Sequence, residues 1–269
     1  MSNEKESKRW NDELWVAAWP KRERLTEALT PYLLEAASAQ PGQRVCDIGC
    51  GGGAQTIALA RAVGSTGLVV GYDISAPLVE LARQRASEAG AVNVEFVVTD
   101  VQTEGLGSEP FDLAVSQLGV MFFDEPLAAF GAIRAGIRAG GRLVFVCWEW
   151  VEKNPWHAGT VMRPFVPPPR VPAPGKSPVG PFSLGDEEYV RDTLGGAGFD
   201  AVESHGFEIT VRAPASAVVD RSLFEFMGVN PERMGEAESA IDQHLARFAV
   251  GDGEYEYPLA FRVYQAVNG

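Results

Sequence analysis

The 269-residue sequence is poor in basic residues, in cysteine and in long apolar runs. It has 23 Lys and Arg and 36 Asp and Glu, which gives a formal charge of −13. Because binding to nucleic acid requires clustered positive charge that neutralises the phosphates, no nucleic-acid partner is expected. Its three cysteines, Cys46, Cys50 and Cys147, show no zinc-type spacing and are expected to pack in the interior. No apolar run approaches the roughly 18 residues of a membrane span, and the polar start is unlike a signal peptide, so a cytoplasmic chain is predicted.

The residue patterns of common hydrolases, metalloenzymes and reductases are missing as well. The sequence has no Ser-His-Asp arrangement around a nucleophile elbow, no His-x-x-x-His pair and no Tyr-x-x-x-Lys pair. It has only three histidines, His157, His205 and His244. We therefore expect no bound metal.

The stretch from Val45 to Gly53, VCDIGCGGG, organises the rest of the chain. Its apolar half, Val45–Ile48, predicts a buried parallel strand, and Ala54–Val63 predicts the helix that follows. The glycines between them permit positive φ angles and let a ligand approach the backbone amides at the helix start, so a nucleotide-like ligand is expected at this turn. The spacing Gly-x-Gly-x-x-Ala from residue 49 also fits the dinucleotide fingerprint, so the glycines alone leave a nicotinamide enzyme open.

Aspartates follow three successive predicted strands. Asp47 lies two residues before the first glycine, where a carboxylate can bind an ammonium group rather than a pyrophosphate. Asp73 ends the strand predicted over Gly67–Tyr72, about 20 residues beyond the glycines, where a carboxylate accepts both ribose hydroxyls. Asp100 follows the strand predicted over Val92–Val98. Because ligands of open α/β sheets bind beyond the carboxyl ends of the strands, we expect all three aspartates to face one ligand. For Asp73, a simple helix cap is the alternative.

The stretch from Val45 to Gly53 resembles motif I of the class I S-adenosylmethionine (SAM) dependent methyltransferases, and the resemblance covers roughly residues 26–148. Four further segments are similar to bacterial small-molecule methyltransferases related to the ubiquinone/menaquinone-pathway C-methyltransferases. They are Trp10-Asn11, Gly119-Val120-Met121-Phe122-Phe123, Cys147-Trp148 and Asn154-Pro155-Trp156. The resemblance implies that SAM is the cofactor.

The resemblance also implies roles for individual residues. Asp100 would accept a hydrogen bond from the adenine amino group, and Ser116 and Gln117 would lie beside the methionine portion of SAM. The residues expected to bind the cofactor are Asp47, Gly49, Cys50, Gly51, Asp73, Ile74, Asp100, Val101, Ser116 and Gln117. The residues expected to contact the acceptor are Trp10, Trp15, Met121, Phe122, Trp148 and Trp156. For these apolar side chains, packing in the core is the alternative.

The alternation of predicted strands and helices indicates an α/β fold with a doubly wound, mostly parallel sheet. The resemblance implies a seven-stranded Rossmann-like methyltransferase with an antiparallel last strand. We expect a single domain over residues 1–269. Its parts are N-terminal cap helices over 1–40, a SAM-binding core over 41–150, a Pro-rich lid over 151–185, and a C-terminal half over 186–269 with a helical insertion at 214–250. Two leading helices are predicted, one around residues 10–18 and one over 22–39.

The lid prediction rests on proline and aromatic residues. Nine of the 18 prolines lie between Pro155 and Pro181, which excludes a regular helix or strand there, and the aromatic residues in this region favour an ordered cover over a linker. Two candidates for a catalytic base or a charge stabiliser lie close by. Glu149 directly follows the fifth predicted strand, and His157 lies just inside the proline-rich stretch.

We hypothesise that the chain transfers a methyl group from SAM to carbon or oxygen of a small, largely apolar acceptor such as a quinone, aromatic, isoprenoid or polyketide-like molecule. Two alternatives remain at this point, an NAD(P)-dependent oxidoreductase and a non-catalytic SAM-binding accessory protein. The expected partner is the small-molecule acceptor, and whether the chain forms a homodimer is left open.

Overall fold

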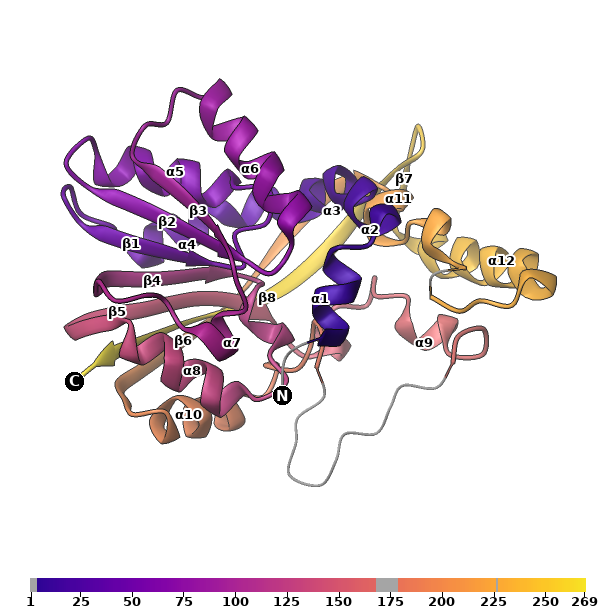
Figure 1. Ribbon diagram of the computed structural model, residues 1–269. Coiled ribbons are helices and arrows are strands. Elements are labelled where there is room, and N and C mark those ends of the chain that lie inside the picture. The colour runs from indigo at the N-terminus through magenta and orange to yellow at the C-terminus, as the bar shows by residue number, and fades with distance from the viewer. Residues whose placement is uncertain (1–3, 168–178, 226) are drawn as a thin grey trace.

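The centre of the molecule is a mixed sheet of eight strands (Figure 1). The computed structural model describes residues 4–167, 179–225 and 227–269. The strand order is β3-β2-β1-β4-β5-β8-β6, and the short β7 pairs with β8. The strands are β1 Arg44–Ile48, β2 Leu68–Asp73, β3 Val94–Val98, β4 Phe111–Gln117, β5 Ile137–Trp148, β6 Phe199–Pro214, β7 Ala249–Gly251 and β8 Glu254–Asn268.

Helices cover both faces of this sheet (Figure 1). Figure 1 shows α4, α5 and α6 on one face and α7, α8 and α10 on the other. Their bounds are α4 Thr30–Ala37, α5 Ala54–Val63, α6 Ala76–Glu88, α7 Val101–Glu104, α8 Pro126–Ala135 and α10 Glu187–Gly196. Parallel strands that are covered on both faces are buried along most of their length, as β1 is from Val45 to Ile48. The predicted doubly wound α/β fold is confirmed.

Strand β1 lies in the middle and fixes where the site forms. It runs parallel to β2 and to β4, so that Cys46 lies opposite Val70 on one side and Ala114 on the other. Val45 and Cys46 are fully buried. Because the strand order changes direction next to β1, the loops that follow β1 and β4 diverge and leave a crevice at their carboxyl ends.

The far edge of the sheet is antiparallel. Strand β8 pairs antiparallel with β5 through Phe145 opposite Tyr264, and with β6 through Phe207 opposite Phe261. The predicted antiparallel last strand is therefore confirmed as β8. The extra strand β7 makes the sheet eight-stranded instead of seven-stranded because Asp252 and Gly253 close a tight hairpin between β7 and β8.

The predicted pair of leading helices is wrong. The segment forms α1 Glu4–Trp10, α2 Glu13–Ala17, α3 Trp19–Thr26, a 3₁₀ turn at Glu27–Leu29, and α4. Asp12 caps the start of α2, where its carboxylate accepts from two backbone amides. Pro20 and Pro31 lie in the first turns of α3 and α4, so each proline begins a helix and interrupts the one before it.

The C-terminal insertion and the described part of the lid lie beside the site. The insertion contains α11 Ala215–Val218, three 3₁₀ turns (Arg221–Leu223, Pro231–Arg233 and Ala246–Phe248) and α12 Met234–Leu245. Of the predicted lid, a 3₁₀ turn at Val151–Lys153 and α9 Gly159–Met162 lie within the described residues, whereas 168–178 lie outside them. Buried apolar residues from Leu25 to Ala266 form one continuous core cluster that includes the insertion. None of the described helices is long and apolar enough to cross a membrane.

Candidate functional site

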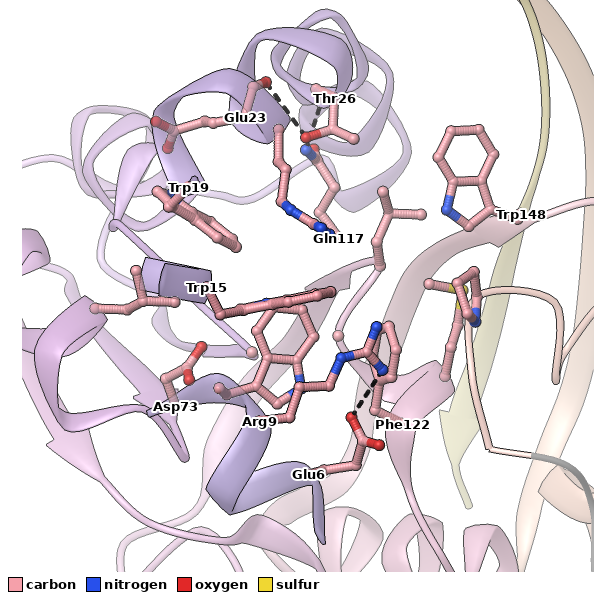
Figure 2. Close-up of a pocket in the computed structure, with 18 of the residues that line it drawn as sticks. Glu6, Arg9, Trp15, Trp19, Glu23, Thr26, Asp73, Gln117, Phe122 and Trp148 are labelled. Atoms are coloured by element: carbon pink, nitrogen blue, oxygen red, sulfur yellow. Dashed lines mark hydrogen bonds and ion pairs between the residues drawn. The ribbon is translucent and has the colours of Figure 1, made fainter. Parts of the chain in front are cut away.

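A cavity of about 410 Å³ opens at the carboxyl ends of β1, β2 and β4 (Figure 2). This volume lies in the range of small-molecule sites, about 300 to 1,000 Å³. Its floor is formed by the loops after the strands, and its roof by the N-terminal helices α1, α2 and α3. Residues 156–162 and 217–220, from the lid and the insertion, complete the wall. The expected crevice at the sheet edge is therefore covered by segments from both ends of the chain.

The glycine turn after β1 allows a very close approach between two chain segments. Gly49 has φ of +72°, and a Cβ there would lie 2.8 Å from the Gly119 Cα. A Cβ on Gly119 would lie 2.6 Å from the Ile48 carbonyl oxygen. Leu118, the residue before Gly119, has φ of +62°, a strained value for a leucine, and it lines the cavity. The sequence contains no signal that predicts this conformation of Leu118.

Asp73 and Asp100 both face the cavity. Asp73 accepts backbone hydrogen bonds of 2.8 Å from Gly51 on Oδ2 and from Ser75 on Oδ1, which fixes its carboxylate at the end of β2. Burial raises the pKa of Asp73. Asp100 begins α7 and accepts from the backbone amide of Gln102 at 3.1 Å. The helix-cap alternative for Asp73 is wrong, because Ser75 caps α6 by accepting from the Leu78 amide at 3.4 Å, whereas the carboxylate of Asp73 borders the cavity.

Other residues predicted to bind the cofactor divide into two groups. The residues that line the cavity are Gly49, Cys50, Ile74, Val101 and Gln117. The residues that do not line the cavity are Asp47, Gly51 and Ser116. Ser116 instead donates to the Ile48 carbonyl at 2.7 Å and accepts from the Gly119 amide at 3.2 Å, so it joins the ends of β1 and β4 beneath the cavity.

Asp47 lies beneath the glycine turn and does not reach the cavity. It is 1% exposed, and its Oδ2 accepts a hydrogen bond of 2.7 Å from the hydroxyl of Thr56 on α5. Burial raises the pKa of Asp47 to about 7, and the Thr56 hydrogen bond offsets part of this shift. In the structure this carboxylate ties β1 to α5, and its contact with an ammonium group stays a prediction.

Replacing Asp47 with asparagine is expected to stabilise the protein more at pH 8 than at pH 5. Between its ordinary pKa of 3.8 and about 7, Asp47 is protonated when folded and ionised when unfolded, so its contribution to stability falls as the pH rises through this window. The asparagine side chain keeps an acceptor for Thr56 and carries no charge. The difference in unfolding free energy between variant and wild type should be about 3 kcal/mol larger at pH 8 than at pH 5. Urea unfolding at both pH values measures it. An equal difference at the two values would contradict the prediction.

The roof is attached directly to the loop that follows β2. Asn11 donates to the Ile74 carbonyl at 3.1 Å and accepts from the Ala76 amide at 3.0 Å. The Ser75 hydroxyl donates to the Trp10 carbonyl at 2.6 Å. Three long-range hydrogen bonds therefore hold the α1–α2 corner beside Asp73.

Gln117 attaches the rest of the roof to the end of β4 (Figure 2). Its side-chain amide donates to the Thr26 carbonyl at 3.0 Å, and its oxygen accepts from the Thr30 hydroxyl at 3.4 Å. Gln117 therefore borders the cavity and also orients α3 and α4. The resemblance predicted only contact with the cofactor.

All six residues predicted to contact the acceptor line the cavity: Trp10, Trp15, Met121, Phe122, Trp148 and Trp156. They also pack on one another, since the ring centroids of Trp10 and Phe122 lie 5.2 Å apart and those of Trp148 and Trp156 lie 5.0 Å apart. These six residues therefore pack against one another as core residues do, and they also form part of the cavity wall. Edge-to-face and tilted pairs of this kind make a rigid apolar wall.

Glu149 lies outside the cavity. It is 3% exposed and forms ion pairs with Arg262 at 2.8 Å and with Lys153 at 3.4 Å. Successive residues along a strand point to opposite sides, so Trp148 faces the cavity and Glu149, the next residue, faces Gly206 on β6. The structure therefore gives Glu149 a structural ion pair and no access to a reacting atom.

His157 does line the cavity, packed edge-to-face on Phe182 at 4.8 Å between ring centroids. Its Nδ1 accepts from the Gly159 backbone amide at 3.3 Å, so the proton of the neutral ring is on Nε2. Burial, with a smaller contribution from His244, lowers the pKa of His157 to about 4. The imidazole is therefore neutral at physiological pH and already uses its acceptor nitrogen.

Several cavity residues were missed by the sequence analysis. Arg9, Trp19 and Arg22 come from the roof, and Asp220 comes from the insertion nearly 200 residues later. Trp15, Trp19 and Arg22 recur at helical spacings of four and three, which signalled a shared face but not what that face covers. No pattern in the sequence could predict that Asp220 would join them.

Comparisons with known proteins agree with this geometry. Residues 39–158 match the family model described as a methyltransferase domain. An aklanonic acid methyltransferase, DauC, of Streptomyces sp. strain C5 is 35% identical over 145 residues, which are 53% of this chain and 62% of that protein. A nocamycin O-methyltransferase of Saccharothrix syringae is 27% identical over 251 residues, 85% of this chain and 87% of that protein. The chain thus spans less than two thirds of the first of these relatives.

A solved SAM-dependent methyltransferase from Aquifex aeolicus superimposes with a TM-score of 0.54 at 18% identity and covers 99% of both chains, which shows a shared fold. The predicted relation to the ubiquinone/menaquinone C-methyltransferases is also confirmed. One such protein, UbiE of Shewanella halifaxensis, is 27% identical over 42% of this chain and 45% of its own. Residues 39–158, which contain the glycine turn and strands β1 to β5, thus resemble a methyltransferase domain, and the chain shares the fold of a SAM-dependent methyltransferase.

Proposed function

We propose that this protein transfers a methyl group from SAM to carbon or oxygen of a small, largely apolar acceptor. The observation that carries the proposal is the cavity itself. Two aspartates at the ends of neighbouring strands, a glycine turn and an aromatic wall all border one space at the edge of the sheet. An adenosyl ligand and an apolar molecule would meet there.

The residues on the floor fit SAM. Asp73 presents a fixed carboxylate to the two ribose hydroxyls, and Asp100 presents an acceptor to the adenine amino group. Gly49 exposes backbone without a side chain to the cavity, and the space where its Cβ would lie is taken by Gly119, 2.8 Å away. In the roof, the Trp19 indole N–H is buried without a hydrogen-bond partner among the described residues, so a donor is available to a bound ligand. Asp47 and Ser116 support this floor from beneath.

When bound, SAM supplies an electrophilic methyl group on a sulfonium. The protein's task is to hold an acceptor atom in line with that methyl group and to exclude water. The rigid wall of Trp148, Trp156 and Phe122 does this for an apolar acceptor. The Nε2–H of His157 can orient an acceptor oxygen by donating a hydrogen bond.

Replacing His157 with glutamine is expected to lower kcat/KM less than about tenfold between pH 6 and 9. The amide keeps a donor close to the position of Nε2, and a histidine whose pKa is lowered to about 4 contributes little as a base in this range. The pH profile of kcat/KM for wild type and variant tests this. General-base catalysis by His157 would appear as a loss of about 100-fold or more together with the loss of an ionisation from the profile.

The names of the relatives support a polyketide-like acceptor among the predicted classes. One relative is named for aklanonic acid and another for nocamycin, the second as an O-methyltransferase. The aromatic lining of this cavity suits a flat, polycyclic molecule.

Calorimetry tests cofactor binding, and a radiolabelling assay tests methyl transfer. We expect S-adenosylhomocysteine (SAH) to bind the folded protein, and radiolabelled SAM to label at least one member of a panel of quinones, phenols and polyketide acids. A folded protein without SAH binding would refute the cofactor assignment. Binding of SAH without labelling of any acceptor would favour a non-catalytic SAM-binding protein. An NAD(P)-dependent oxidoreductase is not favoured, because residues 39–158 match a methyltransferase domain. Light scattering of the same sample tests for a homodimer.

A further inference from the structure

Two arginines, Arg9 and Arg22, line the roof of the cavity beside Trp15, and Figure 2 shows Arg9 there. The guanidinium carbon of Arg22, on α3, lies 3.6 Å from the centroid of the Trp15 ring, and that of Arg9, on α1, lies 4.2 Å from it. Both residues are partly buried, and burial lowers the pKa of each. The roof of an otherwise acidic protein is thus locally positive.

The charges around this roof do not balance. Each of the three carboxylates that line it already pairs with a cation: Glu6 with Arg9 at 3.5 Å, Glu23 with Arg85 at 2.8 Å and Asp220 with Lys21 at 2.8 Å. The side chain of Arg22 forms no ion pair and no hydrogen bond with any described residue, and its Nε is buried without a partner. One guanidinium with unused donors therefore borders the cavity.

A shielded guanidinium without hydrogen-bond partners is costly, because burying a charge requires compensation. The ring of Trp15 provides part of it through a cation–π contact. The planar fork of donors remains unused, and this fork matches the two oxygens of a carboxylate. A bound carboxylate would supply the missing partner.

We propose that Arg22, with Arg9 beside it, binds a carboxylate on the acceptor, so that the acceptor is an aromatic or polycyclic acid. This inference rests on the proposed methyltransferase function. The methionine carboxylate of SAM has the same chemistry and is the other source to distinguish. The groups around Arg22, namely Arg9, Trp15 and Asp220, come from the roof and the insertion rather than from the loops that border the adenosyl site. Because of this position, we favour the carboxylate of the acceptor over that of SAM as the ligand of Arg22.

The test uses protein saturated with SAH and two matched probes, 2-naphthoate and the uncharged 2-naphthamide, with anthraquinone-2-carboxylate and its amide as a larger pair. The variants are Arg22→Gln, Arg22→Lys and Arg24→Gln, the last being the matched control because Arg24 is an exposed arginine on the same helix. In wild type and Arg24→Gln we expect at least one acid to bind about tenfold more tightly than its amide. In Arg22→Gln this preference should disappear, Arg22→Lys should restore part of it, and SAH affinity should stay within about twofold throughout.

Three results would overturn the proposal. The first is that neither acid binds wild type more tightly than its amide. The second is that the preference survives in both Arg22 variants, with folding checked by circular dichroism. The third is a tenfold loss of SAH affinity in Arg22→Gln with the acid preference unchanged, which would assign Arg22 to the carboxylate of SAM. Failure of the wild type to bind SAH would instead refute the proposed function, so the two failures are distinguishable.

Discussion

Replacing Asp73 with asparagine is expected to weaken SAH binding about 100-fold, which corresponds to about 3 kcal/mol. The carboxylate of Asp73 is fixed by the amides of Gly51 and Ser75 at 2.8 Å and has its remaining acceptor capacity directed to the cavity. An amide in its place has one oxygen fewer, and its NH₂ group would face a backbone donor. Hydrogen bonds from ribose hydroxyls to a charged acceptor are each worth about 1.5 to 3 kcal/mol, so losing that acceptor accounts for the expected decrease.

Isothermal titration of SAH into the variant measures this effect. The matched control is Asp192→Asn, which removes the same charge from an exposed position on α10 and should leave the affinity unchanged. Thermal unfolding of both variants separates lost binding from lost structure. If folded Asp73→Asn protein bound SAH within threefold of wild type, Asp73 would not be the ribose ligand, and the cofactor would have to lie differently in the cavity.

Replacing Gly49 with alanine is expected to destabilise the protein by about 3 kcal/mol and to abolish measurable SAH binding. About 1 kcal/mol comes from placing a Cβ on a residue with φ of +72°. The remainder comes from the collision of that Cβ with the Gly119 Cα at 2.8 Å, where backbone must move on both sides. For a chain of this size the midpoint of thermal unfolding should fall by roughly 6 to 12 °C.

The matched control for this variant is Gly90→Ala. Gly90 has φ of +65° at the end of α6, and a Cβ there would have no atom within 4 Å, so it carries the conformational cost without the collision. Its unfolding midpoint should fall by only about 2 to 4 °C, and its SAH affinity should not change. Equal losses of stability in the two variants would show that the close approach of β1 and β4 is not what the glycine at position 49 provides.

The sequence predicted the central sheet because local and tertiary preferences agree there. The apolar run of β1, the glycines after it and the helix over Ala54–Val63 each point to the same strand–turn–helix unit, and the structure contains it at those residues. The N-terminal region was predicted as two helices because helical spacing continues across it. Pro20 and Pro31 divide it into shorter helices that bend over the site. Periodicity indicates a face, but it does not indicate where the chain changes direction.

For the candidate site too, the sequence predicted some features correctly and missed others. The strand ends that carry Asp73 and Asp100 could be located because parallel strands place their carboxyl ends on one edge. Asp47 and Glu149 were expected at the site from their place in the sequence. Alternation along a strand and burial under the turn direct their side chains elsewhere.

The sequence by itself determined the fold class, the cofactor turn and the carboxylates at the sheet edge, because short motifs and strand ends are encoded by neighbouring residues. Only the tertiary structure decided the roof. Arg9, Arg22 and Asp220 come from segments up to about 200 residues apart, and their charges meet because α1, α3 and the insertion pack over the same cavity. Which cation lacks a partner depends on distances between segments, and no pattern along the chain contains those distances.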